Sequence, residues 1–154
     1  MVAPWSDIRL LTANINGVKR NENFTVSSLV VPCDLVCLQE TNYHDVAQRA
    51  TFLYHVSRQS HHCCFYSDFQ SLEESKITHP RAGVMKLISF RLPGSSDVRV
   101  ISSKTIPVRY PVVTTQVGGS TCFFQNDYTP CENHAKTAFY ADLSSHCYPE
   151  GAVT

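Results

Sequence analysis

Two short apolar runs near the amino terminus constrain the fold of this chain most. Residues 8–15, IRLLTANI, are apolar on both faces, a pattern typical of a central strand, and residues 34–40, DLVCLQE, read as a second buried strand. Residues 18–31 between them show helical spacing of apolar side chains, and Pro32 ends that segment. A connection of this length fits a right-handed crossover, so we expect the two strands to be parallel neighbours.

The rest of the chain predicts more strands and two more helices. Helical spacing of apolar residues predicts helices near 45–55 and, after Pro130, over ENHAKTAFYADLSSH. The Gly118-Gly119 pair predicts a tight hairpin. The segments that read as strands are 61–67, 83–89, 98–106 and 110–117. Without an internal repeat or an interdomain linker, residues 1–154 are expected to form one domain.

Composition excludes several classes of protein. The 154 residues are 43% hydrophobic, which is enough for a domain with its own core rather than a disordered chain. The 13 basic and 13 acidic residues cancel, so nucleic acid can only be bound locally. No stretch is long enough to span a membrane and no signal peptide is evident, which predicts an intracellular location without membrane contact. The seven cysteines, an odd number, are then expected to be reduced thiols.

Glu40 raises the main functional question, because a buried strand rarely ends in a carboxylate without a use for the charge. If the first two strands are parallel, Asn14 and Glu40 both lie at carboxyl ends, where ligand crevices form in open α/β sheets. Mg²⁺ prefers one or two carboxylates together with water and phosphate, so Glu40 is a suitable ligand and Asn14 a suitable group to orient it. The alternative is that Asn14 caps the Asn16-Gly17 turn and Glu40 is a solvated strand end.

A zinc site is a weaker hypothesis. The run His61-His62-Cys63-Cys64 could be combined with Cys131 and His134, since all are suitable ligands. Adjacent side chains on a strand point to opposite faces, however, so neighbours in this run cannot easily share one metal ion. Cys33 and Cys37 are expected to act as small apolar residues.

Several motifs in order resemble a known superfamily. TANINGV, DLVCLQET, RAGVMKLIS, and QNDYTPC followed by KTAFYADL look like the first half of the endonuclease/exonuclease/phosphatase superfamily. They are most similar to the apurinic-type endonuclease domains of non-LTR retrotransposons, and the match runs from about Ile8 to Leu143. The resemblance implies an α+β fold, the amino-terminal portion of a four-layer α/β/β/α sandwich with two mostly antiparallel sheets face to face.

The resemblance also implies a function and the residues that perform it. The expected activity is Mg²⁺-dependent hydrolysis of DNA phosphodiesters by an intracellular enzyme, with the nucleus as one location. Glu40 is then the Mg²⁺ ligand, Asn14 supports the metal and phosphate end of the site, and Tyr128 contacts the scissile phosphate. DNA is the implied partner.

Departures from the family pattern change what is expected of this chain. The Gly-Asp-Phe/Leu-Asn strand, with its catalytic Asp, and the final Ser-Asp-His do not occur in residues 1–154. Lys86 interrupts a strand expected to be apolar, and Cys131 stands where the family usually has Asn. The chain therefore reads as a truncated endonuclease domain, inactive alone. The alternative is a non-catalytic remnant or interaction module.

A truncated sandwich has a structural consequence as well. One sheet would lack part of its partner and expose an apolar face around Val84, Leu87 or Phe123, through which the chain would self-associate.

Overall fold

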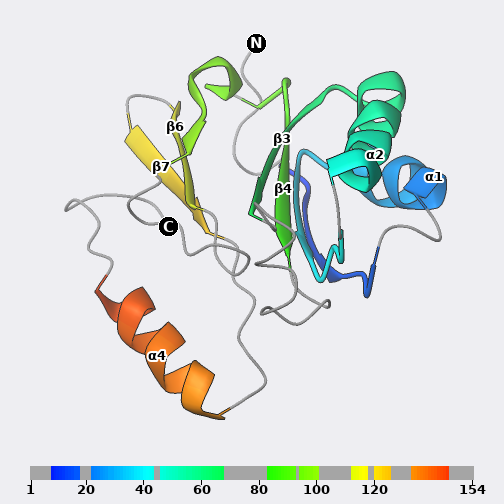
Figure 1. Ribbon diagram of the computed structural model, residues 1–154. Helices are drawn as coiled ribbons and strands as arrows, with labels where there is room; N and C mark the ends of the chain where they lie inside the picture. The colour runs from blue at the N-terminus through cyan, green and yellow to red at the C-terminus, as the bar shows by residue number, and fades with distance from the viewer. Residues whose placement is uncertain are drawn as a thin grey trace.

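The structure is a computed structural model of two β-sheets packed face to face, with helices on the outer side of one sheet (Figure 1). This arrangement confirms the α+β class predicted from the sequence. The structure describes residues 8–17, 22–43, 46–67, 83–92, 94–100, 112–117, 120–125 and 133–145.

The larger sheet, sheet A, has the strand order β1-β2-β4-β3. Strands β1 and β2 are parallel, as the sequence predicts, with Leu10 opposite Leu35 and Asn14 opposite Gln39. Strands β3 and β4 follow in antiparallel orientation. The bounds of these strands are β1 Leu10–Asn14, β2 Leu35–Gln39, β3 His62–Ser67 and β4 Val84–Ser89.

Asp34, immediately before β2, ties three strands of sheet A together at one end. Its Oδ2 accepts a hydrogen bond from the main-chain N–H of Arg9 at 3.0 Å, and its Oδ1 accepts one from Arg91 Nη2 at 3.1 Å. Its main-chain carbonyl accepts the N–H of Ser89 at 2.8 Å. Residues flanking β1, β2 and β4 are thereby held by one buried residue.

Helices cover one face of sheet A (Figure 1). The crossover from β1 to β2 contains α1 (Glu22–Phe24) and the π-helical η2 (Thr25–Val30), where β-branched and serine residues favour a regular α-helix poorly. Helix α2 (Val46–Gln59) extends four residues beyond the predicted end. The first core lies between these helices and the sheet, and its fully buried members are Val26, Val30, Val36, Leu38, Phe52, Met85 and Leu87.

Sheet B packs against the other face of sheet A. It is antiparallel, with the order β5-β6-β7, and η3 (Ser95–Asp97) precedes it. Its strands are β5 (Arg99–Val100), β6 (Val112–Val117) and β7 (Ser120–Gln125). Pairing of Val117 with Ser120 confirms the predicted hairpin. The second core, between the sheets, contains Leu35, Ile88, Leu92 and Val113, with Phe124 packed against them.

The last described helix is α4 (Asn133–Ser144), which the sequence predicts after Pro130. It lies apart from both sheets in Figure 1. Across the described ranges, no helix combines the length and apolar character that crossing a membrane requires.

Two expectations from the sequence are wrong. Strand β1 is an edge strand among the described strands and not a central one, and Leu10 on its inner face is 64% exposed. Val84 and Leu87 are fully buried and Phe123 is 6% exposed, so none of them forms an uncovered apolar face. Sheet B covers β4 and the helices cover Leu87, so the exposed strip lies on β1 instead.

Lys86 is the most unusual residue of the second core, because it is fully buried in the middle of β4. Its Nζ donates a hydrogen bond to the main-chain carbonyl of Phe124 on β7, so it links the two sheets. Burial lowers the pKa of Lys86 to about 8, and the negative charge that Cys37 opposite it carries when ionised opposes this change. Burying the charged ammonium group therefore lowers the stability of the domain.

This burial predicts a pH dependence of stability. Below pH 8 Lys86 is protonated in both states; between about 8 and the ordinary 10.5 only the unfolded state keeps the proton, so the contribution of Lys86 to the free energy of unfolding should rise with pH. We expect K86M to remove this rise and to stabilise the protein at pH 7 by about 1–3 kcal/mol.

Urea unfolding of the wild type and K86M from pH 6 to 10.5 measures the effect. K136M, on the partly exposed side of α4, is the matched control. A wild type whose pH profile parallels that of K86M would contradict the burial of a titrating lysine.

Candidate functional site

The candidate site lies where the carboxyl ends of β1 and β2 meet the amino end of β4. Gln39, the last residue of β2, pairs with Asn14 on one side and with Val84 on the other. Beyond the ladder, the N–H of Ile15 donates to the carbonyl of Gln39 at 3.1 Å, and the N–H of Thr41 donates to that of Gly83 at 3.2 Å. Three chain segments are therefore held together at this edge.

The backbone at this edge is strained. Of the six described residues with positive φ, five lie here and only Gly94 lies elsewhere. Left-handed backbone costs on the order of 1–3 kcal/mol at a non-glycine residue, and such residues gather at functional sites. The five and their φ angles are Asn16 (45°), Gly17 (94°), Glu40 (54°), Asn42 (55°) and Gly83 (109°).

Glu40 occupies the position expected from the sequence. It directly follows β2, and its left-handed backbone turns the chain out of the sheet. Its carbonyl accepts the N–H of Gly17 at 2.7 Å, which joins the Asn16-Gly17 turn after β1 to the end of β2. The residue as a whole is partly buried.

Asn14 has the capping role that the alternative interpretation assigns to it. Its Oδ1 accepts the main-chain N–H of Asn16 at 3.2 Å, and the residue is exposed at the carboxyl end of β1. An amide oxygen has two lone pairs and the amide nitrogen two donors, so the cap leaves capacity for a second partner. The parallel pairing brings Asn14 and Glu40 to the same edge, and a direct contact between their side chains stays a prediction.

Asn42 was missed by the sequence reasoning. Its Oδ1 is buried and has no hydrogen-bond partner among the described residues, and its Nδ2 would lie 3.4 Å from a Cβ atom added to Gly17. A buried amide oxygen without a donor costs about 1–3 kcal/mol. The available signal was the asparagine two residues after a strand-ending glutamate, since asparagine tolerates left-handed backbone.

Some predicted residues are not part of this edge. Tyr128 and Cys131 lie outside the described residues. Cys63 packs into the core between the sheets and Cys64 into the core beneath the helices, which confirms that these neighbours point to opposite faces. Within the described ranges, no group of three or more His, Cys, Asp or Glu side chains could hold a metal ion.

The donors at the edge suit a weakly held hard cation. They are the carboxylate of Glu40 and the amide oxygens of Asn14 and Asn42, of which the last is buried and unsatisfied among the described residues. Mg²⁺ accepts such a set because it keeps several waters and completes its coordination with substrate phosphate. A soft, four-coordinate zinc site has no support in this donor set.

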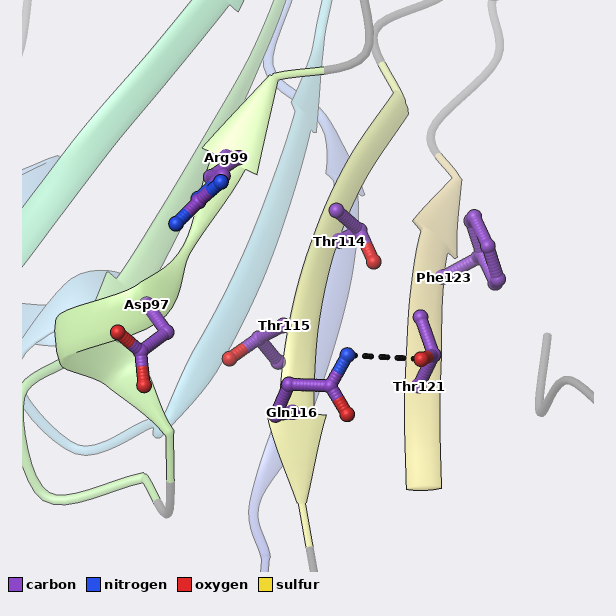
Figure 2. Close-up of a pocket in the computed structure, with 7 residues that line it drawn as sticks. All are labelled: Asp97, Arg99, Thr114, Thr115, Gln116, Thr121 and Phe123. Carbon is purple, nitrogen blue, oxygen red and sulfur yellow. Dashed lines mark hydrogen bonds between the residues drawn. The ribbon is translucent and has the colours of Figure 1, made fainter. Parts of the chain in front are cut away.

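A hollow of about 380 Å³ lies on sheet B, separate from this edge. Figure 2 shows its lining on η3, β5, β6 and β7, where Gln116 Nε2 donates to Thr121 Oγ1 at 2.7 Å. Asp97 and Arg99 are its charged lining residues. A single carboxylate beside threonines provides no catalytic arrangement, so we keep the edge at Glu40 as the candidate site.

The left-handed backbone of Glu40 can be tested by stability alone. E40A keeps the φ strain, whereas E40G relieves it, so E40G should be more stable than E40A by about 0.5–1 kcal/mol in urea unfolding. In ordinary extended backbone, glycine would be the less stable of the two by a similar amount. E40A equal to or more stable than E40G would therefore contradict this geometry.

Comparisons with known proteins identify the fold. No protein-family model matches the chain, and no curated protein matches it. Among solved structures it is similar to AP endonuclease LMAP from Leishmania major, with a TM-score of 0.61 and 14% identity over 90% of this chain and 45% of that one. It is also similar to a humanized D. rerio TDP2, with a TM-score of 0.56 and 13% identity over 94% of this chain and 58% of that one.

A third similar structure carries the family name itself. It is an endonuclease/exonuclease/phosphatase family protein from Leptotrichia buccalis, with a TM-score of 0.53 and 11% identity over 90% of this chain and 62% of that one. The chain thus spans roughly half the length of the solved structures that it matches. Over that length it has the fold of the endonuclease/exonuclease/phosphatase proteins.

Proposed function

We propose that this chain is the amino-terminal part of a Mg²⁺-dependent DNA endonuclease domain, of the apurinic type that non-LTR retrotransposons encode. The observation that carries the proposal is the strained edge at Glu40, where main-chain hydrogen bonds join the ends of β1 and β2 to the start of β4. The fold supports it, because similar solved structures include an AP endonuclease and TDP2. The retrotransposon type is inferred from the order of the motifs in the sequence.

Each residue has a role in this proposal. Glu40 holds the cation at the end of β2, and Asn14 orients the metal and phosphate end of the site from β1. Asn42 positions the turn after β2 through its buried amide, and Tyr128 contacts the scissile phosphate. Bound Mg²⁺ supplies positive charge that stabilises the negative charge developing on the phosphate.

The residues assigned so far do not complete a hydrolytic site. Phosphodiester hydrolysis also needs a base that orients and deprotonates water, and such a group typically contributes about 10² to 10⁴ in rate. Glu40 is the one carboxylate at this edge among the described residues. We therefore propose that residues 1–154 form one domain that carries the metal end of the site and is inactive alone.

A second candidate function follows from the same observation. With a single carboxylate at the described edge, the chain also suits a non-catalytic interaction module that keeps the fold without the chemistry. Metal affinity separates the two candidates, because neither predicts nuclease activity from residues 1–154 alone.

Metal binding is the first test. Titration with MgCl₂, followed by NMR shifts of the amides at 14–17 and 40–42, should show weak, millimolar binding that E40Q abolishes. D97N, which removes an exposed carboxylate on η3, is the matched control and should bind as the wild type does. Unchanged shifts in the wild type would favour the non-catalytic module, and micromolar affinity would show that further ligands exist.

Activity is the second test. The purified chain, incubated with supercoiled plasmid and MgCl₂, should not nick DNA above the background of E40A, because the base and the transition-state donors are unassigned. Nicking by the wild type that is lost in E40A and retained in D97N would show instead that residues 1–154 contain a complete site.

A further inference from the structure

Strand β1 presents its main chain away from the sheet at alternate residues. The carbonyl of Arg9 accepts the N–H groups of Asp34 and Leu35 at 2.8 and 3.1 Å, and the N–H of Ile15 donates to Gln39. In a parallel ladder, a residue bonded to its neighbour uses both main-chain groups on that side, and the next residue faces the other way. The N–H and C=O groups of Leu10, Thr12 and Asn14 therefore point away from β2.

The side chains of the same three residues are exposed. Leu10 is 64% exposed although its register partner Leu35 is only 6% exposed, and Thr12 and Asn14 are also exposed. Sheet B therefore covers β2 but not β1. No described strand pairs with the outer side of β1.

The edge carries none of the features that usually prevent pairing between proteins. Natural edge strands are protected by charged residues, proline, bulges or very short length. Leu10–Asn14, LLTAN, has no charged residue and no proline, and its register with β2 runs through all five residues without a bulge. A regular, uncharged edge of this kind is a template for another strand.

We propose that β1 is the docking edge for a second copy of this chain, paired antiparallel about a two-fold axis at Thr12. In this register Thr12 lies opposite Thr12 of the second copy, and Leu10 lies opposite its Asn14. The outward main-chain groups of all three residues then find partners, and the two four-stranded sheets become one continuous sheet. The two Glu40 edges lie at opposite ends of the paired strands, and Asn14 belongs both to the docking edge, through its main chain, and to the proposed metal site, through its side chain.

A second copy fits this edge better than a strand of unrelated sequence. The antiparallel pairing is self-complementary, and no like charges within Leu10–Asn14 oppose it. About half of the chain of each similar solved structure has no counterpart in these 154 residues, and a second copy is a polypeptide of comparable length that brings a matching edge.

Sedimentation velocity of the purified chain across the micromolar range tests the proposal. The wild type should associate reversibly to a dimer, and T12P should weaken the association at least about tenfold, because proline removes an outward N–H in the middle of the pairing. Proline is tolerated where an edge N–H faces solvent, so the monomer should still fold. T12A, which loses the hydroxyl bonded to Gln39 at 3.0 Å but keeps the N–H, is the matched control and should dimerise.

Hydrogen exchange identifies the surface without a variant. The amides of Leu10, Thr12 and Asn14 should gain protection as the concentration rises, whereas those of Leu11 and Ala13, bonded to β2, should be protected throughout. L10K is a second variant that should weaken the dimer, and because Leu10 is exposed the substitution should not prevent folding if T12P does. A wild type that stays monomeric, a dimer retained in both T12P and L10K, or a dimer with unprotected amides at 10, 12 and 14 would each overturn the proposal.

Discussion

The buried carboxylate of Asp34 holds the register on which the rest of sheet A depends. It receives the main-chain N–H of Arg9 and the guanidinium of Arg91. Burial by itself would raise the pKa of Asp34, but the hydrogen bonds from Arg9 and Arg91 outweigh it and lower the pKa, so the group stays ionised. A slip of one residue would turn every β1 side chain to the opposite face of the sheet. The hydrogen bonds of Asp34 at the start of β1 and β2 therefore decide which residues lie at the carboxyl ends of these strands.

From that register follows the position of Asn14 and Glu40. Parallel strands end at the same edge of a sheet, and the antiparallel β4 begins there, which brings Gly83 beside Thr41. Two glycines and three left-handed side-chain residues let the chain turn out of the sheet within a short distance. The backbone strain of Asn16, Glu40 and Asn42 is the structural cost of this turn.

The two sides of sheet A differ in how completely they are closed. The helix side is apolar and continuous across β1, β2, β4 and β3, with Leu11 and Ala13 of the edge strand included. The side facing sheet B is closed over β2 and β4, contains the buried Lys86, and is open at β1.

What the sequence by itself determined is the set of elements whose signals are local. The apolar runs of β2 and β4, the hairpin after Val117, and a carboxylate at the end of a buried strand all depend on neighbouring residues, and the structure has each where it was predicted. Tertiary structure alone decided the rest. Whether β1 is central or at an edge depends on which strands pair with it, and Lys86 is buried because β7 offers a carbonyl across the core. The turn through the left-handed residues Glu40 and Asn42 is held by partners distant in sequence, because the Glu40 carbonyl accepts the N–H of Gly17 and the Thr41 N–H donates to the carbonyl of Gly83.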